Sequence, residues 1–97
     1  MQFMVLGRPT RKLQACEPEE MRRVLQAEFA RSRQYYEAGY LRNIWVISEH
    51  RGAVCMFEAD SLDALKGLIA AYPLEREGYV EHEIYPLEPY PGFRCQS

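Results

Sequence analysis

The sequence lacks three features that identify common classes of small protein: paired cysteines, an excess of positive charge and a long hydrophobic run. Its cysteines, Cys16, Cys55 and Cys95, are odd in number and far apart, which argues against a disulfide framework or a metal site and for a reducing, cytoplasmic location. The net charge of -2 provides no electrostatic basis for binding nucleic acid. No apolar run approaches the roughly 20 residues of a membrane-spanning helix, and the apolar start is too short for a signal peptide.

The composition that remains is that of one globular domain spanning residues 1–97. Hydrophobic residues make up 47% of the chain and charged residues 27%, values that exclude disorder. A monomer of this length buries only about two-thirds of its extended-chain surface. We therefore expect further burial in a homo-oligomer.

A long helix is expected over residues 18–38. Proline is tolerated in the first turn of a helix, and the acidic residues after Pro18 face the positive end of the helix dipole. Before this helix, residues 2–7 are apolar enough for a buried strand, and the polar stretch up to Cys16 is expected to be a surface loop. The apolar residues of the helix follow the spacing of one buried stripe: Met21, Val24, Leu25, Phe29 and Tyr35 or Tyr36.

Glu28 and Ser32 fall on the same stripe. A carboxylate on the apolar side of a helix is costly to bury unless it is paired or protonated. Glu28 is therefore a candidate functional residue. The alternative interpretation is a position at the edge of the stripe, from which the side chain reaches solvent.

The strand expected over residues 40–48 follows Gly39, which ends the helix. Alternation places Tyr40, Arg42, Ile44, Val46 and Ser48 on one face and Leu41, Asn43, Trp45 and Ile47 on the other. Both faces carry bulky side chains. We expect helices to cover one face and the sheet of another subunit to cover the second.

The rest of the chain predicts a hairpin and a second helix. A polar turn over residues 49–52 leads to a strand over residues 53–59, and Asp60-Ser61 provides an N-cap for a helix over residues 61–72. The last strand is expected over residues 79–85. Residues 86–97 form a proline-rich tail that we expect to pack on itself or on a neighbour. The order strand, helix, strand, strand, helix, strand predicts an α+β, ferredoxin-like fold: a four-stranded antiparallel sheet with two helices on one face.

With these elements in place, the chain resembles the muconolactone delta-isomerase family along nearly its whole length. The features that carry the resemblance are, in chain order, Glu28 in the middle of the long helix, Gly39, Arg42, the Ile44-Trp45 pair, His50 at the hairpin turn, Phe57-Glu58 and Pro73-Leu74. The family's fold is a ferredoxin-like dimeric α/β barrel. Its members assemble into larger rings through sheet-to-sheet dimers.

The resemblance implies an enzyme that moves a double bond within an unsaturated lactone acid, with no cofactor and no metal. Such a proton shift needs a base, a proton donor and a cation for the substrate carboxylate. Glu28 and His50 would be the catalytic acid/base groups, and Arg42 would bind the carboxylate with two hydrogen bonds. The walls of the substrate pocket would be Trp45, Tyr35, Tyr36 and Tyr40.

The chain also departs from the family. Where the family usually has an apolar residue, this chain has His82, and Glu49 precedes the turn histidine. About two extra residues lie between the second helix and the last strand, and the tail is unusually rich in tyrosine and proline. His82 is either a core histidine with satisfied hydrogen bonds or a new acid/base group that contacts the substrate, which would imply a different substrate.

Each candidate also has a purely structural interpretation. His50 would be an exposed turn residue, Arg42 would pair with a surface glutamate, and Trp45 would pack in the core or an interface. Two other functions compete with isomerisation of a lactone or a related cyclic acid. One is a tailoring enzyme of a natural-product pathway, either a cyclase or a cofactor-free oxygenase, acting on a polyketide-like small molecule. The other is a non-catalytic ligand-binding or assembly module.

Overall fold

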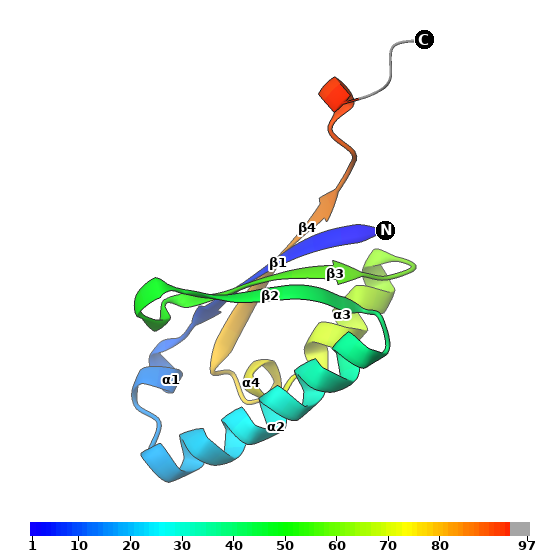
Figure 1. Cartoon of the computed structure of the whole chain (residues 1–97). Helices are drawn as coiled ribbons and strands as arrows, with labels where there is room; N and C mark the ends of the chain where they lie inside the picture. The colour runs from blue at the N-terminus through cyan, green and yellow to red at the C-terminus, as the bar shows by residue number, and fades with distance from the viewer. Residues whose placement is uncertain (94–97) are drawn as a thin grey trace.

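The computed structural model describes residues 1–93, and the order of main elements predicted from the sequence is confirmed (Figure 1). The elements are β1 (Gln2–Pro9), α1 (Arg11–Gln14), α2 (Pro18–Glu37), β2 (Leu41–Ile47), η1 (Ser48–His50), β3 (Gly52–Glu58), α3 (Leu62–Ala70), α4 (Pro73–Arg76), β4 (Val80–Leu87) and η2 (Pro91–Phe93). Among these residues, no helix is long and apolar enough to cross a membrane.

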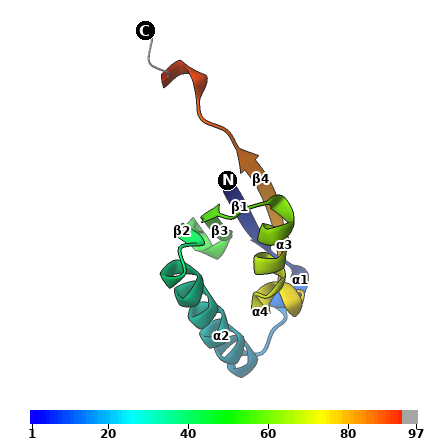
Figure 2. The same cartoon turned by 90° about the vertical axis from the view of Figure 1, so that its right-hand side faces the viewer.

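The four strands form one antiparallel sheet in the order β2-β3-β1-β4. All the α-helices lie on one side of this sheet, which Figures 1 and 2 show from two directions. The central strands β1 and β3 come from the two βα units of the chain, and β2 and β4 form the edges. This is the ferredoxin-like α+β arrangement, as predicted.

The two long helices begin and end where the sequence indicates. Pro18 occupies the first turn of α2, and Gly39 follows the helix with a φ of 88°, a left-handed conformation that favours glycine. The Ser61 hydroxyl accepts a hydrogen bond from the Ala64 N–H at 3.0 Å and caps α3. Local sequence thus determines the extent of both helices.

The segment after the first strand differs from the prediction of a loop. The strand β1 continues to Pro9 because it pairs with β4 along its whole length, from Gln2 opposite Leu87 to Pro9 opposite Val80. The short helix α1 follows at once. Similarly, the expected charged loop after α3 contains the short helix α4, with Pro73 in its first turn.

The core lies between the helices and the sheet. Its most deeply buried large side chains are Phe3, Val5, Val24, Phe57 and Leu65. Around them pack Tyr35, Leu41, Cys55, Ala59, Ile69 and Tyr72.

The inner side of α2 is more polar than the predicted stripe. Phe29 is 55% exposed, so its expected burial was wrong. Of the two tyrosines predicted as alternatives, Tyr35 is buried and Tyr36 is 66% exposed. The side that faces the sheet instead follows Val24, Glu28, Ser32 and Tyr35, which are three or four residues apart. Each residue turns the helix by about 100°. A buried stripe that includes Glu28 therefore leaves Phe29 on the solvent side.

A β-bulge changes the predicted faces of β2. The register shifts between Leu41 and Asn43, so that Leu41 pairs with Phe57 while Ile44 pairs with Cys55. A bulge inserts one extra residue on one strand and reverses the alternation beyond it. Leu41 therefore shares the core-facing side with Ile44, instead of the face of Asn43 and Trp45 on which alternation placed it.

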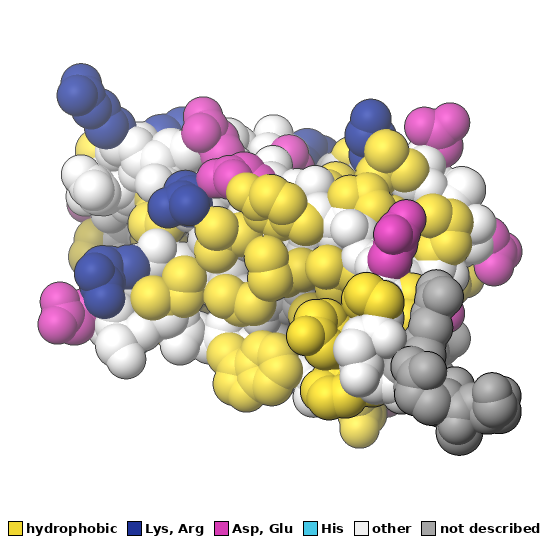
Figure 3. Space-filling view, turned by 90° about the horizontal axis from the view of Figure 1, so that it is seen from above, with side chains coloured by type: hydrophobic (Ala, Val, Ile, Leu, Met, Phe, Trp, Pro, Cys, Tyr) yellow, Lys and Arg dark blue, Asp and Glu magenta, His cyan; other side chains and the backbone are white. Residues whose placement is uncertain are grey.

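The outer face of the sheet, opposite the helices, is apolar and uncovered in a single chain. Pairing places the side chains of Trp45, Val54 and Leu6 in one row across this face. Figure 3 shows hydrophobic side chains gathered along it. The residues of this outer face are Met4, Leu6, Trp45, Val54, Met56 and Tyr85. Such a patch is typical of a protein interface.

The proline-rich tail begins later than predicted, because β4 runs to Leu87. The following residues project away from the body of the molecule (Figures 1 and 2). Tyr90 and Phe93 contact each other edge to face at 4.9 Å between ring centroids, and both are exposed. Packing of the tail on a neighbour stays a prediction, and residues 94–97, including Cys95, lie outside the described residues.

Two substitutions in α3 should change stability in opposite directions. Leu65 is fully buried, so Leu65→Ala leaves a cavity and should lower the free energy of unfolding by about 2–5 kcal/mol. A Cβ added at Gly67 would meet no other atom within 4 Å, so Gly67→Ala should raise it by up to about 1 kcal/mol. Urea denaturation at one protein concentration measures both. A destabilising Gly67→Ala would contradict the placement of α3.

Candidate active site

Glu28 lies on the inner side of α2, half-buried between this helix and α4. Its Oε1 accepts a hydrogen bond from the Leu74 N–H at 3.0 Å. Leu74 is the second residue of α4, where backbone N–H groups have no partner within the helix. Glu28 thus satisfies a free donor of another element, which argues against the interpretation of a side chain that simply reaches solvent.

The surroundings of Glu28 raise the pKa of its carboxyl group above the ordinary value. Burial is the largest cause, and the nearby negative charge of Glu75 acts in the same direction. The hydrogen bond from Leu74 lowers the pKa but does not cancel these effects. Glu28 therefore keeps a proton to higher pH than a free glutamate, as a carboxyl group used in proton transfer needs to.

His82 lies on the helix-facing side of β4 and is held by Glu75. Its Nδ1 is 2.8 Å from Glu75 Oε2, and the imidazole side chain is only 11% exposed. The Tyr72 ring stacks against the imidazole, with ring centroids 6.5 Å apart and ring planes inclined by 24°. Gly7 on the neighbouring strand makes room for the imidazole, because a Cβ there would lie 3.2 Å from His82 Nε2.

Tyr72 connects His82 to the helix that carries Glu28. Its hydroxyl lies 3.1 Å from the hydroxyl of Ser32, which is one helical turn beyond Glu28. Burial raises the pKa of Tyr72 strongly, and the charge of Glu28 contributes to the shift, so the phenol stays protonated at neutral pH. We call the set of Glu28, Ser32, Tyr72, Glu75 and His82 the inner polar cluster.

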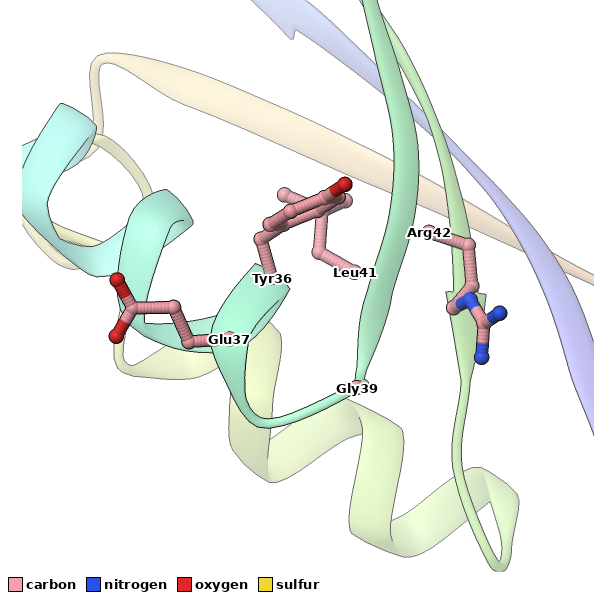
Figure 4. Close-up of a pocket in the computed structure, with 5 residues that line it drawn as sticks. All are labelled: Tyr36, Glu37, Gly39, Leu41 and Arg42. Atoms are coloured by element: carbon pink, nitrogen blue, oxygen red, sulfur yellow. The ribbon is translucent and has the colours of Figure 1, made fainter.

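Arg42 lies in a different place, at the corner where α2 leads into β2. A groove of about 450 Å³ is lined there by Tyr36, Glu37, Gly39, Leu41 and Arg42. Figure 4 shows Tyr36 and Arg42 on opposite sides of the β2 ribbon. A second groove, of about 400 Å³, is lined by Gln2, Arg42, Asn43 and Glu58. Within residues 1–93, no acidic side chain forms an ion pair with Arg42.

The grooves and the inner polar cluster are far apart in one chain. Glu28 and Glu37 are nine residues apart on α2, which corresponds to about 13 Å along the helix axis. Arg42 lines both grooves and Tyr36 lines one of them, and neither groove contains a buried acid. We assign the acid/base chemistry to the cluster, because its titratable groups are hydrogen-bonded and partly buried, and because burial raises the pKa of Glu28.

The other predicted residues do not join the cluster in a single chain. His50 is exposed in the turn η1 and has no hydrogen-bonding partner among the described residues. Trp45 lies on the outer face of the sheet and is 55% exposed. Tyr40 contacts Tyr35 edge to face at 6.1 Å. The structure thus brings together Glu28 and His82, and it separates them from His50, Arg42 and Trp45.

Sequence reasoning missed Glu75 and Tyr72 as members of the site. Both lie in the segment after α3 that was expected to close a helix and form a charged loop. The available signal was Pro73, which marks the first turn of a new helix and so predicts a free N–H at Leu74. The described residues contain no group of three histidine, cysteine or acidic side chains that could hold a metal ion.

Comparison with protein families finds a match over nearly the whole chain. A model of the muconolactone delta-isomerase family matches residues 1–92. Among curated protein sequences, none matches the chain significantly.

Solved structures share the fold at low sequence identity. A crystal structure of muconolactone isomerase has a TM-score of 0.79 and 21% identity, covering 100% of this chain and 98% of that one. The 5-chloro-2-hydroxyhydroquinone dehydrochlorinase of Burkholderia phenoliruptrix AC1100, solved with 2,5-dihydroxybenzoquinone, has a TM-score of 0.72 and 13% identity, covering 91% and 94%.

The raised pKa of Glu28 predicts a pH-dependent cost in stability. The ordinary value is 4.5, and the folded-state pKa lies above it, so the folded protein binds this proton more tightly than the unfolded chain. The stabilisation that the Glu28 proton contributes to the fold is therefore full below about pH 4.5. It is lost as the pH rises through the folded-state pKa. Glu28→Gln keeps an oxygen for the Leu74 N–H and removes this dependence.

We expect the gain in free energy of unfolding from Glu28→Gln to be larger at about pH 8 than at about pH 4. Urea denaturation at both pH values, at one protein concentration, measures it. Glu37→Gln on the exposed side of α2 controls for the loss of one charge. An equal effect of Glu28→Gln at both pH values would contradict the burial of this carboxyl group.

Proposed function

This chain belongs to the muconolactone delta-isomerase family, and on this basis we propose that it is a cofactor-independent enzyme that moves a double bond in an unsaturated lactone or a related cyclic acid. The observation that carries the proposal is the half-buried Glu28, held by the Leu74 N–H and with its pKa raised by burial. Membership of the family supports the reaction class. The site supports the chemistry of proton transfer.

The reaction consists of two proton transfers. A base removes a proton from the saturated carbon at one end of the allylic system, the negative charge spreads onto the carbonyl oxygen, and a proton returns at the carbon at the other end. In this proposal Glu28 is the base. Its Oε1 is held by Leu74, and its Oε2 has no hydrogen-bonding partner among the described residues, so that oxygen is free to contact a substrate. A raised pKa makes the carboxylate a stronger base.

A histidine provides the second proton-transfer group in this proposal. The protein contains two, His50 and His82. Family resemblance favours His50 at the hairpin turn. Proximity to Glu28 favours His82 in the inner polar cluster.

The proposed substrate contacts are Arg42 for the carboxylate and Tyr36, Tyr40 and Trp45 for the ring. In one chain they lie at the other end of α2 or on the outer sheet face. We therefore propose that they act in a homo-oligomer, with a second copy packed against the outer face of the sheet. The exposed apolar side chains of that face support this assembly.

A second candidate is a tailoring enzyme, a cyclase or cofactor-free oxygenase, that acts on a polycyclic aromatic compound. The observation that favours it is the aromatic character of the exposed surface around β2, where Tyr36, Tyr40 and Trp45 are all exposed. It predicts quenching of tryptophan fluorescence as such a compound stacks near Trp45. Muconolactone in the same titration serves as the comparison ligand.

The decisive test of the isomerase proposal is Glu28→Gln. We expect turnover of muconolactone, followed by the absorbance change of double-bond migration, to fall roughly a hundredfold to ten-thousandfold, because the amide cannot accept the proton. Glu19→Gln, at an exposed acidic residue of the same helix that lines neither groove, is the matched control, and we expect it to keep full turnover. Unchanged turnover of Glu28→Gln would remove Glu28 from the mechanism and favour a non-catalytic binding module.

A further inference from the structure

We propose that His82, held in place by Glu75, is the second catalytic residue and donates the returning proton from its Nε2. This inference rests on the proposed proton-transfer function and specifies its second group. It is carried by three observations: the position of His82 beside Gly7, its contact with Glu75, and the arrangement of α4 between Glu28 and His82. Glu75 is a positioning residue, since it acts through the imidazole.

The contact with Glu75 defines which ring nitrogen is free. Glu75 Oε2 lies 2.8 Å from His82 Nδ1, and an ionised carboxylate only accepts hydrogen bonds. Nδ1 therefore carries a proton, which leaves Nε2 as the nitrogen that exchanges protons with a ligand. When both ring nitrogens carry a proton, Nδ1–H is bound to Glu75 and Nε2–H is the one that can be donated to a ligand.

Nε2 is open to a ligand. It has no hydrogen-bonding partner within residues 1–93. In the same part of the chain, no buried side-chain nitrogen or oxygen lacks a partner. Nε2 is therefore in contact with solvent, although the His82 side chain is only 11% exposed.

The sheet beside Nε2 is lined by small residues. Pairing places Val46, Ala53, Gly7 and His82 in one row on the helix-facing side of the sheet. The two central positions of the row carry a methyl group and a hydrogen atom, so they do not cover the imidazole edge. Val46 at the end of the row is 68% exposed, which shows that α2 does not close this end. In this proposal a flat ring approaches Nε2 along the row.

Two adjacent residues of α4 hold the two proposed catalytic groups. Leu74 donates its N–H to Glu28, and the Glu75 carboxylate accepts from His82. Glu75 is also close enough to Glu28 for its charge to raise the pKa of that carboxyl group. The short helix therefore fixes Glu28 and His82 relative to each other. In each side chain one polar atom is bound to α4, and the other has no hydrogen-bonding partner within residues 1–93.

In this arrangement Glu28 and His82 exchange one proton each with the substrate. Glu28 Oε2 takes a proton from the saturated carbon at one end of the allylic system, and the electron pair of the broken C–H bond spreads through the conjugated system onto the carbonyl oxygen as an enolate. The imidazolium Nε2–H then gives its proton to the carbon at the other end, and the new C–H bond completes the shifted double bond. The proton on Glu28 returns to Nε2 before the next turnover, so that the enzyme ends unchanged.

No other titratable group around the cluster can take this role at neutral pH. Burial raises the pKa of the Cys55 thiol to about 12 and raises the pKa values of the Tyr35 and Tyr72 phenols. These groups stay protonated and are too weakly acidic to donate efficiently. The competing histidine, His50, lies in an exposed turn.

The activity test compares three variants of the full chain on muconolactone: Glu28→Gln, His82→Asn and His50→Asn. The asparagine at position 82 retains an amide for Glu75 and lacks Nε2. We expect His82→Asn to lower turnover at least roughly tenfold more than His50→Asn, because donation by a general acid contributes about a hundredfold or more. A greater loss with His50→Asn would overturn the inference while leaving the proposed function intact, provided that Glu28→Gln is impaired.

The second test needs no activity and so stands even if the proposed function fails. Nitrogen-15 NMR of the neutral imidazole reports which nitrogen of His82 carries the proton. We expect the Nδ1–H form in the parent protein and in Glu75→Gln, which keeps an acceptor oxygen, and a shift toward the Nε2–H form in Glu75→Ala. An Nε2–H form in the parent protein, or no change in Glu75→Ala, would overturn the role of Glu75. Dispersed amide spectra establish that each variant is folded.

Discussion

The hydrogen bond from the Leu74 N–H to the Glu28 carboxylate is the contact on which the site depends. It joins α2 to α4 across 46 residues of sequence and satisfies two groups that would each be costly to bury alone. Without a donor, the carboxyl group would have to turn toward solvent. With one donor on one oxygen, it stays between the helix and the sheet, keeps a raised pKa and retains a free second oxygen. The same hydrogen bond therefore stabilises the packing of the two helices and prepares Glu28 for proton transfer.

The single chain leaves part of the protein incomplete. The outer face of the sheet is apolar and uncovered, and the residues proposed to bind substrate lie away from the inner polar cluster. Both features follow from one geometric fact: a ferredoxin-like sheet has helices on one face only. A second copy on the other face would bury the hydrophobic side chains and bring further side chains near the site. The proposed assembly and the proposed substrate contacts thus belong together.

The fold was predictable because its signals are local. Gly39 and Ser61 mark helix boundaries through their own backbone and side-chain chemistry, and alternating apolar residues identify the strands. The errors arose where a contact with a distant element decides the outcome. Pairing with β4 extends β1 to Pro9, and a bulge opposite β3 turns Leu41 toward the core. Neither effect leaves a mark in the neighbouring sequence.

For the site, helical periodicity by itself determined that Glu28 lies on the buried side of α2, since residues three or four apart share a face. The sequence also singled out His82 as a histidine among apolar neighbours. Only the tertiary structure decided that these two residues belong to one cluster, that Glu75 and Tyr72 complete it, and that Arg42 and Trp45 lie elsewhere. The reason is that distances between side chains on different elements depend on strand register and helix packing, which periodicity within one element does not encode.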